Sequence, residues 1–182
     1  MRKFIITIDG PAASGKEKIA KYISNKWKLI HLDSGVLYRK LAIILIDKKI
    51  NIKKTSEIDK FLKNIKIISY RKDKKVRSEE VGIIASQIAI YDNVRKFINN
   101  LQHNFVNSNS HSSGFVIDGR DIGSKVFKKA QLKLYIDVNP EIRAKRRYKQ
   151  LIDSCEKSIY PKILKDIKLR DKQDKLRKHS PL

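Results

Sequence analysis

Short apolar runs alternate with amphipathic stretches along this chain. Four apolar runs, partly β-branched, have the length of strands that are buried on both faces, and they lie at 4–8, 29–33, 115–118 and 132–138. Apolar residues at helical spacing predict helices between and after these runs, at 15–27, 34–44, 56–65, 81–88, 94–105, from Asn139-Pro140 onward, and at 159–172.

This alternation predicts an α/β fold with a short parallel sheet flanked by helices. The helices of 51–107 interrupt the alternation, and we interpret this segment as an inserted lobe. The core would then consist of 1–50 and 108–182. Within the lobe, Asp92 is expected to be the N-cap of the helix that follows it, and 66–76 to form a small hairpin.

The composition limits the class of protein. A length of 182 residues and a hydrophobic content of 41% suit a globular domain with a sizeable core. No apolar run approaches the roughly 20 residues that span a bilayer, so we expect no membrane partner. The single cysteine, Cys155, excludes an intramolecular disulfide and agrees with a cytoplasmic location.

The chain is strongly basic, with 42 Lys and Arg against 19 Asp and Glu and a formal net charge of +23. One interpretation is a polyanionic partner such as nucleic acid. The other is a general drift of composition, because the lysines are spread over the whole length and the chain is also rich in Ile and Asn. The charge alone does not separate the two.

Residues 10–18 read GPAASGKEK and match the phosphate-binding pattern G-x-x-x-x-G-K after a predicted strand and before a predicted helix. Glycines let the loop backbone approach phosphate oxygens, and the helix adds its positive N-terminal end. The residues expected to bind ATP are Gly10, Pro11, Ala12, Ala13, Ser14, Gly15, Lys16, Glu17 and Lys18. Glu17 stands where the pattern usually has the serine or threonine that contacts Mg²⁺.

Four further motifs accompany the loop: LDSGVLYR at 32–39, VRSEEVGIIASQIAIYDNVR at 76–95, VIDGRDIGSKVF at 116–127 and LRDKQDKLRKHSPL at 169–182. Together they resemble bacterial cytidylate kinases over nearly the whole chain. The resemblance implies a P-loop kinase core, a mostly helical insert that binds the nucleoside monophosphate, and a short mobile lid within about 147–178. It also implies transfer of the γ-phosphoryl group of ATP to CMP or dCMP, with Mg²⁺ as cofactor.

The resemblance assigns roles position by position. It implies catalytic roles for Lys16, Arg120, Arg146 and Arg147, the last two as lid arginines that move onto the ATP phosphates. It implies that CMP contacts Ser34, Arg39, Ser86, Arg95, Arg120, Asp121, Arg170, Asp174 and Arg177. Arginines suit phosphoryl transfer because the planar guanidinium holds phosphate oxygens two at a time. Asp118 is a candidate for ordering Mg²⁺ through water, and a structural role at the end of its strand is the alternative.

The chain departs from the family pattern in four places. The loop ends in Glu17-Lys18 where the family has Gly-Thr or Gly-Ser, and Gln173, Lys175 and Leu176 replace two arginines and an asparagine of the lid. The segment 65–76 is shorter than in the family. The sequence given ends at Leu182, before the last strand and helix of the family, so 132–138 is expected to be an edge strand.

The leading interpretation is a cytidylate kinase with ATP and CMP or dCMP as its small-molecule partners. A folded relic that binds nucleotides without turnover is the alternative, because the metal-binding hydroxyl is missing from the loop. A nucleic-acid-binding protein is less favoured, since no aromatic stacking platform stands out in the sequence. The resemblance implies a monomer.

Overall fold

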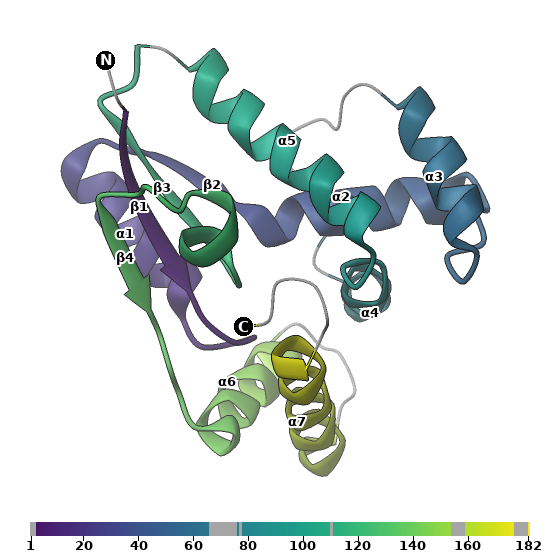
Figure 1. Cartoon of the computed structure of the whole chain (residues 1–182). Helices are drawn as coiled ribbons and strands as arrows, with labels where there is room; N and C mark the ends of the chain where they lie inside the picture. Colours follow the sequence, from purple (N-terminus) through teal and green to yellow (C-terminus); the bar gives the residue numbers. More distant parts are fainter. Residues whose placement is uncertain (1–2, 66–75, 77, 110, 154–158, 177–181) are drawn as a thin grey trace. The chain divides into compact units, whose positions relative to one another are not determined.

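The computed structural model describes residues 3–65, 76, 78–109, 111–153, 159–176 and 182 (Figure 1). Its elements are, in order, β1 (Phe4–Asp9), α1 (Lys16–Trp27), β2 (Ile30–Asp33), α2 (Ser34–Asp47), α3 (Thr55–Asn64), α4 (Glu79–Ile88), α5 (Asp92–Ser108), β3 (Gly114–Gly119), a short π-helix (Ile122–Val126), β4 (Leu132–Tyr135), α6 (Pro140–Asp153) and α7 (Tyr160–Leu176). The hairpin expected at 66–76 lies, except for Val76, outside the described residues. The chain forms two compact units, Met1–Leu32 with Ser112–Leu182, and Asp33–His111.

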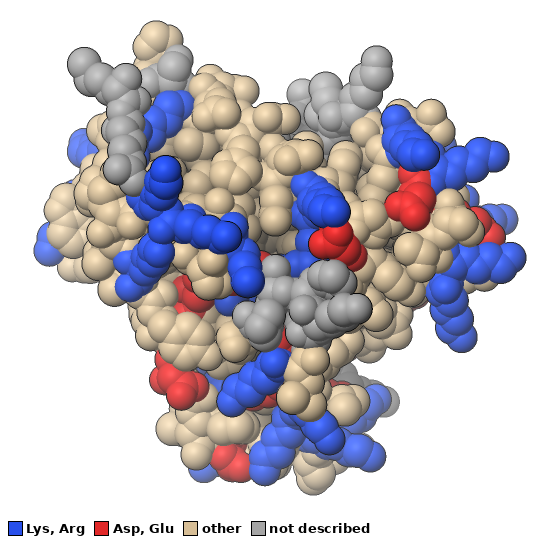
Figure 2. All heavy atoms as spheres, viewed as in Figure 1, with Lys and Arg blue, Asp and Glu red and all other residues tan. Residues whose placement is uncertain are grey.

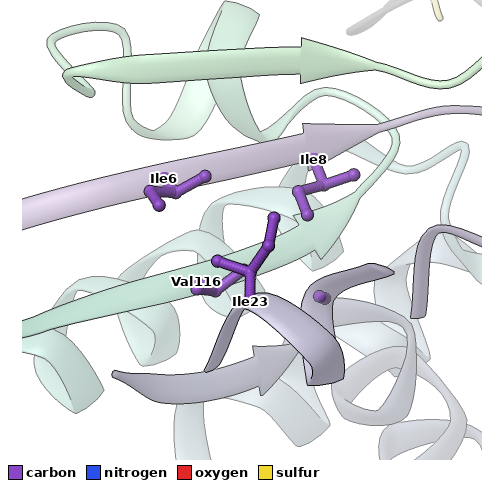
Figure 3. Close-up of a cluster of buried hydrophobic side chains, with 5 residues drawn as sticks. Ile6, Ile8, Ile23 and Val116 are labelled. Atoms are coloured by element: carbon purple, nitrogen blue, oxygen red, sulfur yellow. The ribbon is translucent and has the colours of Figure 1, made fainter. Parts of the chain in front are cut away.

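The first unit is built on a four-stranded sheet with the order β2-β3-β1-β4. β1 pairs in parallel with β3 and with β4, so that Ile6 lies opposite Val116 on one side and Leu132 on the other. Ile6 and Ile8 of β1 pack with Val116 of β3 and with Ala20 and Ile23 of α1 (Figure 3). The predicted α/β fold with a short parallel sheet is confirmed.

β4 lies at the edge of this sheet, as expected. The strand is shorter than the predicted 132–138 and ends at Tyr135. Beyond it, the Ile136 N–H donates to the Asp9 carbonyl of β1 at 2.8 Å. Leu132 and Tyr135 are exposed, unlike the buried residues of β3.

The last two helices of the first unit pack on each other. Ala144 and Leu151 of α6 form a cluster with Ile163 and Ile167 of α7. The start of α6 agrees with the sequence, since Pro140 is its first residue and the Asn139 side chain accepts the Glu141 N–H at 2.8 Å.

In the second unit, α2 packs against α4 and α5, and α3 packs against α5. Asp33 is the N-cap of α2 and accepts the Val36 N–H at 3.3 Å. The prediction that Asp92 caps α5 is wrong. The N-cap is Tyr91, and Asp92 lies inside the first turn, where its carboxylate pairs with Lys96 one turn later at 2.7 Å. This unit begins earlier than the predicted lobe of 51–107, and the assignment of that lobe stays a prediction.

Candidate active site

The phosphate-binding loop connects β1 to α1 in the first unit. Two of its positions require glycine. A Cβ on Gly10 would lie 2.4 Å from the Ile136 carbonyl oxygen, and Gly15 has a φ of 93°, which other residues rarely adopt. The α1 helix starts immediately afterwards, at Lys16, so its N-terminal N–H groups adjoin the loop.

Basic side chains bind the carbonyl oxygens of this loop. Lys16 Nζ donates to Pro11 at 3.2 Å, Arg120 Nη1 to Gly10 at 3.0 Å, and Arg146 Nη1 to Ser14 at 3.2 Å. These cations offset the negative ends of the carbonyl dipoles, and the loop becomes a more favourable place for an anion.

Ser14 adds a second feature that suits an anionic ligand. The residue is buried, and its hydroxyl oxygen has no hydrogen-bond partner among the parts of the chain that the structure describes. A buried hydroxyl usually finds a partner, and a phosphate oxygen would supply one. The loop therefore fits the phosphates of a nucleotide, as its sequence pattern predicts.

Arg120 connects the loop to α7. Its Nε donates to Asp174 Oδ2 at 2.9 Å, while its Nη1 holds Gly10. Both members of this ion pair are mostly buried, and neighbouring Asp121 is buried as well. The structure thus brings together three of the residues expected at the acceptor site, and the pairing of Arg120 with Asp174 is a contact that no motif of the sequence predicts.

Sequence reasoning missed Asp9, which is the last residue of β1. Its two carboxylate oxygens accept the N–H groups of Ile122 and Gly123, each at 2.8 Å, and so hold the start of the π-helix that follows Arg120 and Asp121. Burial raises the pKa of Asp9, and the two backbone N–H bonds oppose that rise. The sequence feature that could have identified Asp9 is its position, because it is an acidic residue at the end of a predicted buried strand and directly before the loop.

Asp118, the candidate for ordering Mg²⁺, lies in β3 with almost no exposed surface. Its Oδ1 lies 2.6 Å from His31 Nε2 in β2. Glu17 pairs with Lys21 at 2.6 Å, and Lys18 is exposed. The described residues contain no cluster of three or more His, Cys, Asp or Glu side chains that could hold a metal. This donor set does not fit a metal held directly by the protein.

The remaining lid residues lie on α6 and α7. Arg146 is exposed next to the loop, and Arg147 and Arg170 are half-buried. A Cβ added to Gly15 would have Arg146 Nη1 at 3.6 Å, so this arginine lies directly over the loop. Arg177 lies outside the described residues.

The predicted CMP contacts of the second unit lie on three helices that pack together. Arg39 of α2 donates to the carbonyl oxygens of Val76 at 2.8 Å and Ser78 at 3.1 Å. Arg95 of α5 donates to the Ala89 carbonyl at 3.1 Å. Ser34 starts α2 and is buried, and Ser86 is half-buried on α4. Their roles toward CMP stay predictions.

The fold is similar to the crystal structure of TT1252 from Thermus thermophilus, with a TM-score of 0.52 and 16% identity, over 100% of this chain and 87% of that chain. Fold and loop together define the class of protein as an α/β protein with a P-loop.

The sequence model of the family "Cytidylate kinase" matches residues 6–182. The chain is 40% identical to the cytidylate kinases of Rickettsia akari (strain Hartford) and Rickettsia felis, over 100% of this chain and 80% of each relative. The cytidylate kinase of Rickettsia conorii is 39% identical over the same shares. The chain belongs to the cytidylate kinase family, whose members are ATP-dependent nucleoside monophosphate kinases. In the part of the chain that the structure describes, no helix is long and apolar enough to cross a membrane.

Proposed function

We propose that this protein transfers the γ-phosphoryl group of ATP to CMP or dCMP and releases ADP and CDP or dCDP. The observation that carries the proposal is the loop whose carbonyl oxygens are held by Lys16, Arg120 and Arg146, together with membership of the cytidylate kinase family. Phosphoryl transfer depends mainly on positioning and on positive charge around the phosphates, and this loop offers both.

In this proposal the ATP phosphates lie on residues 10–18, with Lys16 at the β- and γ-phosphates and the lid arginines Arg146 and Arg147 over them. Arg120 and Asp121 face the acceptor, and Asp174 and Arg170 of α7 complete its site with Arg177. Arg39, Arg95, Ser34 and Ser86 of the second unit bind CMP. Binding of the substrates would replace the Arg120–Asp174 ion pair, at least in part, by contacts to CMP.

Mg²⁺ enters this proposal as part of the ATP complex, because the described residues do not form a protein-held site. The metal supplies charge neutralisation on the phosphates. The domains proposed for this protein are those expected from the sequence: a core of 1–50 and 108–182, a lid within about 147–178 and an insert of 51–107. A monomer in the cytoplasm is the state we expect.

A second candidate function rests on one observation. The loop ends in Glu17 and Lys18, and neither side chain carries the hydroxyl that usually binds the metal at this point of the pattern. The carboxylate of Glu17 pairs with Lys21. A protein that binds nucleotides but has lost turnover would keep the same fold and loop.

The test of the acceptor is a coupled assay that measures ADP formation from Mg·ATP with CMP, dCMP, UMP or AMP. We expect CMP and dCMP to give a kcat/KM at least about tenfold above UMP and AMP, because a site built to hydrogen-bond one base rejects others that leave its polar groups unpaired. A preference for UMP or AMP would contradict the proposed acceptor.

A further inference from the structure

Arg143 is the most unusual side chain of α6. It is 2% exposed and is the largest fully buried side chain among the residues that the structure describes, although α6 is rich in exposed basic residues such as Lys145 and Lys149. A buried charge of this kind is costly unless it is paired and hydrogen-bonded. The hydrogen bonds of its guanidinium therefore indicate the structural role of this buried charge.

The guanidinium of Arg143 joins three separate segments of the first unit. Its Nε donates to the Val138 carbonyl at 2.7 Å, ahead of α6, and its Nη1 donates to the Ala12 carbonyl in the phosphate-binding loop at 3.2 Å. Nη1 and Nη2 also donate to the two carboxylate oxygens of Asp171 in α7, the first at 3.0 Å. This bidentate pair fixes the plane of the guanidinium.

The contact with Ala12 completes a regular pattern. Gly10, Ala12 and Ser14 are alternate residues of the loop, and an arginine binds the carbonyl of each: Arg120, Arg143 and Arg146 in turn. Arg146 is exposed, and Arg120, although mostly buried, keeps 18% of its side-chain surface exposed, so that both can exchange these bonds for bonds to phosphate. Arg143 is buried and its three guanidinium nitrogens all donate to protein oxygens, so it holds the middle of the loop without offering a group to phosphate.

We infer that Arg143, oriented by Asp171, is a positioning residue that fixes the conformation of the phosphate-binding loop and couples it to α7. This inference rests on the proposed function, since it assigns the pair a role in binding the ATP phosphates. Arg143 does not touch the substrate. Arg143 acts through Ala12, because its Nη1 donates to the Ala12 carbonyl. This bond fixes the backbone at Ala12 and so positions the N–H groups of the neighbouring loop residues.

The variants that test this role are Asp171→Asn and Arg143→Lys. Asp171→Asn keeps the size of the side chain but removes the charge that orients the guanidinium. Arg143→Lys keeps the positive charge but cannot make the bidentate pair and reach Ala12 with the same fixed fork. Arg143→Ala is unsuitable because it would leave Asp171 unpaired in a largely buried place and unfold part of the protein.

A matched control joins the same two helices without touching the loop. Glu141 of α6 and Lys168 of α7 form an exposed ion pair at 2.9 Å. Glu141→Gln removes this link between α6 and α7 and leaves the contact of Arg143 with Ala12 in place. It separates an effect of the loop from an effect of helix packing alone.

The experiment measures the dissociation constant of ADP by calorimetry and, for turnover, the KM for ATP and for CMP. We expect both Asp171→Asn and Arg143→Lys to weaken ADP binding and raise the KM for ATP about tenfold, since small misplacements of a binding group have large effects. The KM for CMP should change less than about twofold, and Glu141→Gln should leave all three values unchanged.

Equal effects of Asp171→Asn and Glu141→Gln would overturn the inference, as would variants that lower the melting temperature while ADP binds as in the parent protein. The two proposals fail separately. If the parent protein binds ADP but does not turn over, the proposed function is wrong, and the change in ADP affinity between parent and variants still decides the role of Arg143.

Discussion

Lys16 is the residue whose charge the proposed chemistry needs most directly. Its ammonium group now lies 3.2 Å from the Pro11 carbonyl, within the loop, and the loop pattern directs it to the β- and γ-phosphates. A side chain that exchanges a carbonyl for a phosphate oxygen contributes to binding and catalysis much more than to the fold.

We therefore expect Lys16→Met to lower kcat by about a hundredfold or more, the loss typical of one preorganised electrostatic group, with a small effect on the free energy of unfolding. Steady-state formation of ADP measures this. Lys21→Met is the control, because Lys21 lies on the same helix and forms an ion pair with the half-buried Glu17. A Lys16→Met variant that keeps a tenth or more of the parent rate, about 1.4 kcal/mol in barrier height, would contradict the role of Lys16.

Asp9 gives a prediction about pH. Burial raises its pKa in the folded protein above the ordinary 3.8, so the folded state holds the proton more tightly than the unfolded state. The resulting stabilisation is complete below the ordinary pKa and is lost as the pH rises through the folded pKa.

Asp9→Asn removes this titration and one acceptor of the Ile122 and Gly123 N–H groups. At acidic pH the protonated carboxyl of Asp9, like the carboxamide of the variant, has one carbonyl oxygen to accept an N–H, so we expect the two unfolding free energies to agree within about 1 kcal/mol. As the pH rises through the folded pKa of Asp9, the parent should lose stability relative to the variant, which lacks this titration. Denaturant unfolding at both pH values measures the two free energies; a parent that gains stability over the variant as the pH rises would contradict the raised pKa.

The sequence predicts individual site residues by motif and spacing but not the contacts among them. The loop could be located because glycine at positions 10 and 15 followed by lysine has a specific structural cause. The bonds from Arg120 to Gly10 and from Arg143 to Ala12 join residues more than a hundred positions apart. No local pattern specifies such pairs, because they depend on how β3, α6 and the loop pack in three dimensions.

At the scale of elements, the centre and the edge of the sheet differ in what they contribute. Ile8 of β1 is fully buried between neighbouring strands and α1, whereas Leu132 of the edge strand β4 is 43% exposed. Burial of an apolar side chain stabilises the fold in proportion to the area removed from water.

We expect Ile8→Ala to lower the free energy of unfolding by about 2–5 kcal/mol, the range for large-to-small changes in a core. Leu132→Ala should change it by about 0.5 kcal/mol or less, as for other exposed positions. Urea denaturation of the two variants and the parent measures both. Similar losses at both positions would show that β4 is covered in solution, contrary to the edge position in this structure.

The elements themselves were largely predictable, because strands and helices have distinct periods of apolar residues. The π-helix at Ile122–Val126 was not, since it is stabilised by Asp9 from another strand rather than by its own sequence. The assignment of Asp92 as the cap was wrong by one residue, because the sequence signal for a helix start does not fix the first residue. The N-cap is Tyr91, whose hydroxyl donates to the Ile52 carbonyl at 3.0 Å.

At the scale of the whole molecule, the net charge of +23 comes from lysines and arginines spread along the whole sequence. Figure 2 shows lysine and arginine side chains distributed over the visible face, with acidic residues among them. A diffuse charge attracts polyanions weakly and without direction, whereas the phosphate-binding loop makes directed contacts.

Salt therefore separates the two kinds of binding. We expect the affinity for random duplex DNA to fall about a thousandfold between about 50 and about 200 mM KCl, while the affinity for ADP falls less than about tenfold. Fluorescence anisotropy with labelled DNA and calorimetry with ADP measure the two. DNA binding that persists at the higher salt concentration would favour a nucleic-acid partner instead.

The most direct test of the account follows the phosphoryl group itself. The protein is incubated with Mg·ATP labelled at the γ-phosphate and with CMP, and the products are separated. We predict that the label appears in CDP with the parent protein and with Lys21→Met, and is reduced about a hundredfold with Lys16→Met. Nucleotide that stabilises the parent protein against heat while no label reaches CDP would contradict the account and identify a binding protein without kinase activity.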